Sequence, residues 1–260
     1  MDKRGENPAR EKERLTHFGR ETVAESTKAG RVSEVFSSVA KNYDLMNDLM
    51  SAGIHRLWKD AFVAWLSPRP GWAYADVAGG TGDIARRIAA CVAAKGKAAI
   101  TVIDANEDML AAGRARAKDE PGAGMIAWLK GDAETLPLKD ASIDAYTIAF
   151  GIRNVTRIEA ALGEAARVLK PGGRFLCLEF STVAVPGLDD IYELYSSGVL
   201  PQLGDIVAGD REAYQYLVDS IRRFPDQKRF ATLIAKSGLA QVKWRNLSGG
   251  IAAMHSAFRL

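Results

Sequence analysis

Cysteine is scarce in this sequence of 260 residues, and so is histidine. The two cysteines, Cys91 and Cys177, lie far apart and within apolar runs, so they supply neither a disulfide framework nor the ligand spacing of a zinc site. We therefore expect both to be buried thiols in a reducing compartment, and we expect no metal site.

Long apolar segments and a strong charge of one sign are also missing. No stretch of about 18 consecutive apolar residues, the length that a membrane span needs, occurs without charges, and the N-terminus lacks a signal-peptide apolar region. The formal net charge is +3 and no Lys/Arg-rich block occurs, so nucleic acid is not an expected partner. We expect a cytoplasmic protein, with peripheral attachment to the inner membrane as the alternative.

The chain is long enough for one domain with helical additions, which we place over residues 31–260. Residues 1–30 mix charges of both signs with few apolar side chains, which predicts a mobile tail. Helical spacing then predicts an N-terminal helical cover over about 31–70. Residues 188–224 resemble a lid rich in tyrosine. Its aromatic side chains either line a channel for an apolar tail or fill the core of a capping helix pair.

Short apolar runs alternate with helix-like segments from Trp72 onward, a pattern typical of a parallel sheet in the α/β class. Proline and glycine at 170–173 are expected to end the helix predicted at 158–169. Two strand-like runs at 241–247 and 251–259, joined by Ser-Gly-Gly, predict a closing hairpin. The other strands are predicted at 74–78, 99–103, 125–129, 145–150 and 174–180, and the helices at 83–94, 107–118, 158–169 and 226–237.

A glycine-rich turn follows the first strand of this series and comprises Gly79, Gly80, Thr81 and Gly82. Glycines let the backbone pass close to a ligand, and the N-terminus of the next helix offers free N–H groups to a carboxylate or phosphate. A tight strand-to-helix turn without any ligand explains such a motif as well. The turn therefore indicates a binding site only in combination with further residues.

Two acidic residues supply that combination. Asp104 closes the second strand, where a carboxylate can accept hydrogen bonds from both hydroxyls of an adenosine ribose. Asp132 follows the third strand and can accept a bond from the adenine amino group, while the N–H of Ala133 can donate to a ring nitrogen. Because ligands bind at the carboxyl ends of parallel strands, the arrangement predicts an adenosine-containing cofactor. NAD remains an alternative, although the third glycine of its fingerprint is replaced by Ala85.

Several motifs are more specific than the glycine turn: VFSSVA at 35–40, MNDLMS at 46–51, GIHRLW at 53–58, FGIRNVT at 150–156 and NLSGGIA at 246–252. With these motifs the sequence resembles the UbiE-type ubiquinone/menaquinone biosynthesis C-methyltransferases over nearly its whole length. The resemblance implies a class I S-adenosylmethionine-dependent methyltransferase, Rossmann-like, with a seven-stranded, mostly parallel sheet. It also implies that Thr81, Asp104, Asp132 and Ala133 contact S-adenosyl-L-methionine. Relatives often have serine at Ala149, so one hydroxyl contact is missing here.

The implied chemistry needs a strengthened carbon nucleophile, so the acceptor should be a reduced polyprenyl quinol whose phenolate activates the adjacent ring carbon. Arg153 and Asn154, just past the fourth strand, could hold that phenolate as a cation and an amide. The general base stays open between His55 and Tyr43. A surface position for His55 and a packing role for Tyr43 explain these two residues equally well.

Other readings of the function also stay open. One is a methyltransferase that acts on another phenolic or lipid acceptor, and another is a cofactor-binding subunit of a quinone-biosynthesis complex that catalyses nothing. A lipid-tailed substrate would require visits to the membrane surface, although the sequence shows no dedicated anchor. A homodimer is a further expectation.

Overall fold

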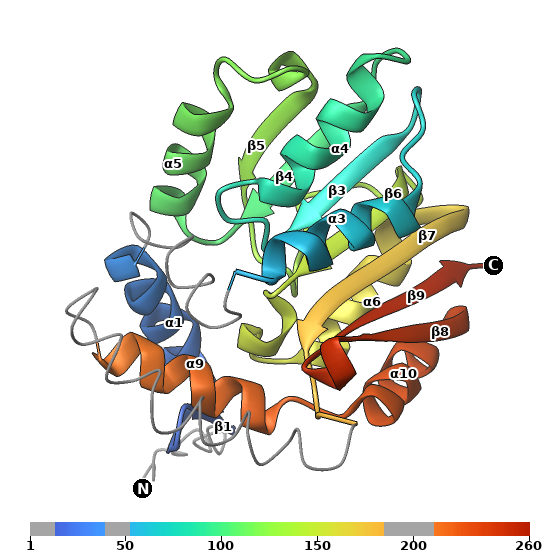
Figure 1. Cartoon of the computed structure of the whole chain (residues 1–260). Helices are drawn as coiled ribbons and strands as arrows, with labels where there is room; N and C mark the ends of the chain where they lie inside the picture. Colours follow the sequence, from blue (N-terminus) through green and yellow to red (C-terminus); the bar gives the residue numbers. More distant parts are fainter. Residues whose placement is uncertain (1–13, 40–52, 185–210) are drawn as a thin grey trace, which may run out of the picture.

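A seven-stranded sheet forms the centre of the computed structural model, which describes residues 14–39, 53–184 and 211–260 (Figure 1). The strand order is β5-β4-β3-β6-β7-β9-β8, and β9 runs antiparallel to both of its neighbours while the remaining strands are parallel to one another. The predicted closing hairpin is therefore present. The strands are β3 (Ala73–Val77), β4 (Ala99–Asp104), β5 (Ile126–Lys130), β6 (Ile143–Ala149), β7 (Leu169–Phe180), β8 (Leu239–Leu247) and β9 (Ala252–Arg259).

Helices cover both faces of the sheet (Figure 1). On one face α3, α4 and α5 share a core with β3 and β4, and on the other face α6 and α10 share a second core with β3. The helices are α1 (Glu25–Val39), α3 (His55–Leu66), α4 (Asp83–Ala93), α5 (Glu107–Ala117), α6 (Ile158–Val168), α9 (Arg211–Arg223) and α10 (Gln227–Lys236), with short 3-10 turns η2 (Ala123–Met125), η3 (Ile152–Asn154) and η5 (Ser248–Gly250).

The inner strand β3 shows why apolar residues occupy the consecutive positions Tyr74 and Ala75. Successive side chains of a strand point to opposite faces, so Tyr74 joins the core under α3 and α4 while Ala75 joins the core under α6 and α10. Both residues are completely buried. A strand covered on both faces needs apolar residues at consecutive positions, and this distinguishes it from the edge strands β5 and β8.

Two sequence expectations are corrected here. The helix before 170–173 ends as expected, at Val168, but the strand predicted at 174–180 begins earlier, because β7 starts at Leu169, which pairs with Ile143. A register shift between Ile143 and Ala145 takes up the glycines and lets the strand continue. The second correction concerns the thiols: Cys177 is buried as expected, but Cys91 is exposed on α4.

The expected tail is also shorter than its predicted 30 residues. The strands β1 (Leu15–Phe18) and β2 (Glu21–Ala24) form an antiparallel hairpin, and α1 begins at Glu25 rather than near Val32. The ring of Phe18 stacks on Tyr216 of α9 with the ring centroids 4.5 Å apart, so a distant aromatic residue buries one of the few apolar side chains of this segment. Residues 1–13 lie outside the described part.

The predicted lid is described only from Arg211 onward, as α9. This helix lies beside α1 at the end of the sheet where the parallel strands finish (Figure 1). Tyr192 and Tyr195 lie outside the described residues. Within the described ranges, no helix combines the length and the apolar character that crossing a membrane requires.

Candidate functional site

A cavity lies at the carboxyl ends of β3, β4, β5 and β6, and α1 closes it on one side. The loops after these strands supply one wall, and Ala29, Val32, Ser33 and Phe36 of α1 supply the other. The cavity contains about 840 Å³ of empty space, including the part open to solvent. The cavity therefore lies at the edge of the sheet that the sequence analysis predicts as the ligand-binding edge.

The glycine-rich turn contributes one of its four predicted residues to this wall. Gly80 lines the cavity at φ +53°, and a Cβ atom there would lie 2.9 Å from the Met109 methyl group. Gly79 and Gly82 lie behind the wall: a Cβ on Gly79 would meet the Asp76 carbonyl oxygen, and one on Gly82 would meet the Trp128 ring. Thr81 is buried as well. The glycines of this turn therefore leave space for neighbouring protein atoms at Gly79 and Gly82 and for the cavity at Gly80.

Asp104 lies on the cavity wall at the end of β4. Its Oδ2 accepts a hydrogen bond of 2.8 Å from the Gly80 N–H, and its Oδ1 accepts one of 2.9 Å from the Asn106 N–H. Burial raises the pKa of this carboxyl, and the backbone donors act against that shift. Each oxygen retains a lone pair, so the carboxylate can still accept bonds from ligand hydroxyls.

Asp132 and Ala133 line the cavity after β5. The Asp132 Oδ1 accepts a hydrogen bond of 2.9 Å from the Glu134 N–H, which fixes the carboxylate in a tight turn. Ala133 is buried and also lines the cavity. The predicted pair of an acidic acceptor and a neighbouring N–H is therefore brought to the same cavity as Asp104.

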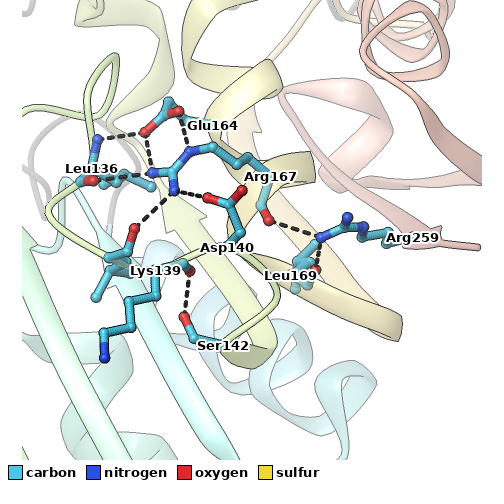
Figure 2. Close-up of polar contacts among 9 residues, drawn as sticks. Leu136, Lys139, Asp140, Ser142, Glu164, Arg167, Leu169 and Arg259 are labelled. Carbon is cyan, nitrogen blue, oxygen red and sulfur yellow. Dashed lines mark hydrogen bonds and ion pairs between the residues drawn. The ribbon is translucent and has the colours of Figure 1, made fainter.

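A polar cluster anchors the loop that follows this pair, as Figure 2 shows. The Glu164 carboxylate on α6 accepts from the Leu136 N–H at 2.6 Å. Arg167, one turn further along α6, donates to the carbonyl oxygens of Leu136 and Leu138 at 3.1 and 2.8 Å and to the Asp140 carboxylate at 2.6 Å. Because the donors of one guanidinium hold both ends of this stretch, the loop after β5 is fixed to the helix behind it.

Asn106 is a site residue that the sequence reasoning missed. Its Oδ1 accepts from the Met109 N–H at 3.0 Å and so caps α5, while its amide nitrogen donates to the Ser33 carbonyl and the Ser37 hydroxyl of α1. One side chain thereby joins the helix after Asp104 to the helix that covers the cavity. The signal was present in the sequence, because asparagine directly before two acidic residues is a typical helix N-cap.

Asp76 was also missed, because it precedes the glycines and does not line the cavity. Its carboxylate is buried under the turn and accepts from the Thr147 hydroxyl at 2.9 Å and from the Ala85 N–H at 3.2 Å. Burial raises the pKa of Asp76 to about 7, against these two donors. A carboxyl that changes charge near neutral pH therefore lies directly beneath the turn.

Arg153 does not face the cavity that contains Asp104. Its side chain is 2% exposed, and its Nη1 donates to the Glu179 carboxylate at 2.7 Å and to the Phe150 carbonyl oxygen at 2.5 Å. Burial raises the pKa of Glu179, and the Arg153 charge opposes that rise. The guanidinium balances a buried carboxylate in this arrangement, and the predicted role of Arg153 in holding a phenolate stays a prediction.

Asn154 does line the cavity, and its Oδ1 accepts from the Tyr216 hydroxyl of α9 at 3.1 Å. Burial raises the pKa of Tyr216 to about 12, so this hydroxyl stays protonated and donating. Of the two candidate bases, Tyr43 lies outside the described residues. His55 is buried at the start of α3 and is not on the cavity wall, so the surface position considered for it is wrong.

Comparison with known proteins decides the family. Residues 22–259 match the ubiE/COQ5 methyltransferase family. The chain belongs to this family. It is 58% identical over 245 residues to the ubiquinone/menaquinone biosynthesis C-methyltransferase UbiE of Paracoccus denitrificans, covering 94% of this chain and 97% of that protein. The protein of the same name from Dinoroseobacter shibae is 55% identical over 248 residues, 95% of this chain and 98% of that one. The predicted resemblance is confirmed, and the chain is a methyltransferase.

Solved structures agree on the fold. A SAM-dependent methyltransferase from Thermotoga maritima, described as a possible histamine N-methyltransferase, has a TM-score of 0.59 at 22% identity and covers 87% of this chain and 99% of its own. One from Aquifex aeolicus has a TM-score of 0.59 at 17% identity, with 86% and 98% coverage. The predicted fold class is therefore confirmed. The ubiE/COQ5 family and this fold together imply that the chain uses S-adenosyl-L-methionine.

Proposed function

We propose that the chain transfers a methyl group from S-adenosyl-L-methionine to a ring carbon of a polyprenylated benzoquinol or naphthoquinol in ubiquinone or menaquinone biosynthesis. The main support is the cavity in which Gly80, Asp104 and Asp132 meet at the carboxyl ends of three strands. The relatives named UbiE supply the substrate class, because the chain matches them over almost their whole length. A methyltransferase acting on another phenol is the alternative that the same cavity allows.

The residues of the cavity fit an adenosyl cofactor. The Asp104 carboxylate would accept bonds from the ribose hydroxyls, because its loop already fixes both oxygens at the wall. Asp132 would accept from the adenine amino group while the Ala133 N–H donates to the ring. The missing side chain of Gly80 leaves room for close approach, and Gly79, Thr81 and Gly82 support the turn from behind.

The bound cofactor supplies an activated methyl group on a sulfonium, so the protein has to align the acceptor and stabilise its phenolate. Asn154 is the better placed of the two predicted residues. Its Oδ1 is engaged by the Tyr216 hydroxyl, which orients the amide so that its N–H groups are free to donate toward an oxyanion at the wall. Arg153 does not line this cavity, so its side chain would have to change conformation to contact the phenolate as well.

The polyprenyl tail of the proposed substrate requires that the protein also reach a membrane surface. The substrate resides in a lipid phase, so the protein should meet it at a membrane surface as a peripheral protein. Three further predictions remain: contact with a quinone-biosynthesis complex, location at the inner membrane, and a homodimer.

The reaction is tested by incubating the purified chain with methyl-labelled cofactor and a panel of short-tailed benzoquinols, naphthoquinols and simple phenols. We expect label on the ring carbon of a reduced quinol and none on the oxidised quinone, because only the phenolate activates the ring. Transfer to phenols but to no quinol would contradict the proposed substrate. Cofactor binding without transfer to any acceptor would favour a non-catalytic subunit instead.

The cofactor site is tested separately by calorimetry with S-adenosylhomocysteine. Asp104→Asn should weaken binding by about 1.5 to 3 kcal/mol, the usual value for hydrogen bonds to a charged group. Asp119→Asn is the matched control, because Asp119 is exposed just beyond α5 and does not line the cavity. Equal affinities of the two variants would remove Asp104 from the site.

A further inference from the structure

One surface of the sheet, outside the cofactor cavity, has no part in the reaction proposed above. On this side α3 packs against β7, and β9 and β8 continue the sheet beyond β7 (Figure 1). Side chains alternate along a strand, so Lys243 and Arg245 of β8 lie on the same side as Leu247, which packs against the core under α3. Trp244 lies on the opposite side and stacks on His255. The charged residues of this edge strand therefore lie on the same side of the sheet as α3.

Two guanidinium groups contact the ring of Trp65, which lies near the end of α3. The Cζ atom of Arg245 lies 4.5 Å from the ring centroid, and that of Arg174 on β7 lies 5.4 Å from it. Lys243 is the third cation, because it pairs across the strands with Ser256, whose hydroxyl accepts from the Arg174 Nε at 3.1 Å. Lys243 and Arg245 are exposed, and Arg174 is half-buried. Three cations therefore share one small area.

These three cations lack a counter-charge. Within residues 14–39, 53–184 and 211–260, none of them forms an ion pair with a carboxylate. Burial lowers the pKa of Arg174, and the neighbouring charge of Arg245 lowers it further. Like charges held this close repel one another, and an anionic group would both relieve the repulsion and accept hydrogen bonds from the exposed donors. The charge of this area therefore favours an anionic partner.

The outer side of α3 adds exposed apolar side chains to the same surface. Leu57, Ala61 and Trp65 are spaced by four residues, so they follow one another along the helix. Leu57 and Trp65 lie about 12 Å apart along its axis. Leu57 is 67% exposed, and Ile54, directly before the helix, is 40% exposed. An apolar stripe beside a group of cations is typical of surfaces that rest on lipid headgroups.

The start of α3 lies close to the cofactor cavity. Trp58 donates from its Nε1 to the Ser248 hydroxyl at 3.0 Å, and its ring centroid lies 6.4 Å from that of Phe150. Phe150 in turn lines the cavity. A bilayer along α3 would therefore lie next to the end of the sheet that holds the cavity.

We propose that this surface, which we call the α3–β8 face, binds the surface of an anionic phospholipid bilayer. The face comprises Ile54, Leu57, Trp65, Arg174, Lys243 and Arg245. Its cations attract the lipid phosphates, while Ile54 and Leu57 enter the boundary between headgroups and acyl chains. A soluble polyanion would neutralise the cations but leave the apolar stripe in water. The inference rests on the proposed function, because a polyprenylated acceptor has to be taken from a lipid phase.

Cosedimentation of the full chain with vesicles, without cofactor or quinol, tests the charged part of the face. We expect saturable binding to equimolar phosphatidylglycerol and phosphatidylcholine, and much weaker binding to phosphatidylcholine alone. One lysine or arginine near an anionic surface contributes about fivefold in affinity, so Lys243→Gln combined with Arg245→Gln should weaken binding by about tenfold or more. The matched control is Lys228→Gln with Lys236→Gln. It removes the same charge from exposed positions of α10, which covers the opposite side of the sheet, and should bind like the parent.

Leu57→Gln tests the apolar part of the face. Because this side chain is exposed, thermal unfolding should be unchanged while binding to the mixed vesicles weakens several-fold. Leu15→Gln is the matched control, since Leu15 on β1 is 68% exposed and lies outside the α3–β8 face. It should bind the vesicles like the parent.

Several results would overturn the proposal. Equal binding to both kinds of vesicle would do so, as would unchanged binding in the Lys243/Arg245 variant or in Leu57→Gln. An equally large loss in the α10 control would reduce the effect to net charge and overturn it as well. Binding to soluble polyglutamate without binding to vesicles would identify an acidic protein as the partner instead.

Methyl transfer is measured separately, on a short-tailed quinol in solution and on a long-tailed quinol in the mixed vesicles. The Lys243/Arg245 variant should keep the first activity and lose most of the second. Vesicle binding as expected, without transfer to any quinol, would support the α3–β8 face and contradict the proposed function. Transfer to the short-tailed quinol without vesicle binding would contradict the α3–β8 face alone.

Discussion

Charged side chains at two places on the same edge of the sheet differ in their environment: one set lines the cavity and the other is buried in an ion pair. After β4 and β5, Asp104 and Asp132 bond backbone amides of their own loops and remain on the cavity wall. After β6 and at the end of β7, Arg153 and Glu179 are buried and bond each other. A position at a strand end therefore brings a residue to the functional edge, but the partner of its charge decides whether it can serve a ligand.

Breaking the buried pair should have the largest effect. Arg153→Ala leaves the Glu179 carboxylate uncompensated in the interior, and we expect a loss of about 3 to 5 kcal/mol in the free energy of unfolding. Urea denaturation measures this loss. Replacing both residues, as Arg153→Met with Glu179→Gln, should recover part of it because no buried charge remains. An Arg153→Ala variant of full stability that has lost turnover with saturating cofactor would support the predicted role of Arg153 in holding the phenolate.

The carboxyl under the turn provides a pH test. The native pKa of Asp76 is about 7, well above the ordinary value of 3.8, so between these values the native state keeps a proton that the unfolded state has lost. Stability should therefore fall as the pH rises through this window, by up to about 1.4 kcal/mol per unit, and level off above it. Urea unfolding at several pH values should show a flatter slope for Asp76→Asn than for the parent.

Two other carboxyls have to be separated from this effect. Asp104 shifts in the same direction, so Asp104→Asn is the comparison variant, and the larger change of slope should belong to Asp76. At Asp83 burial is outweighed by Lys59 and Arg87, and the pKa falls to about 2. Its contribution is lost only as the pH drops below about 4, outside the window. An unchanged slope in Asp76→Asn would mean that this carboxyl is ionised in the native state.

Much of the cavity wall at Asp104 and Asp132 was predictable from sequence, and most of the environment of Arg153 was not. Glycines and acids at strand ends are local signals, so Gly80, Asp104 and Asp132 were placed correctly at the wall. The pairing of Arg153 with Glu179 joins the turn η3 to the strand β7, and no local pattern in the sequence predicts it. For the same reason the hairpin before α1 was taken for a tail, since Phe18 finds its apolar partner on α9.

The glycine turn allows packing to be separated from backbone conformation. Gly82 has φ +70°, and a Cβ there would lie 2.4 Å from the Trp128 ring, whereas Gly238 has φ +92° with nothing within 4 Å. Gly82→Ala should therefore destabilise the fold by about 1 to 3 kcal/mol more than Gly238→Ala, the usual range for overpacking. Thermal unfolding of both variants gives the difference. Equal losses would indicate that the φ angle alone requires glycine at this turn.

The smallest effect on ligand binding and stability is expected from removing Arg167, which holds the loop after Asp132 from outside the cavity. Arg167→Met removes the bonds that hold the loop after Asp132, each worth about 0.5 to 1.5 kcal/mol, and frees the part of the wall formed by Asp132 and Ala133. Affinity for S-adenosylhomocysteine should fall several-fold, with a modest loss of stability.

Arg229→Met is the control for this change. The Arg229 side chain is 82% exposed and, within the described ranges, pairs only with Asp226, at 3.3 Å, so removing it should leave both quantities unchanged, as is usual for surface ion pairs. If Arg167→Met binds the ligand as tightly as Arg229→Met does, the turn at Asp132 holds its geometry without α6. The cavity wall at Asp104 and Asp132 would then be held by local contacts alone, whereas Arg153 after β6 would still depend on Glu179 of β7.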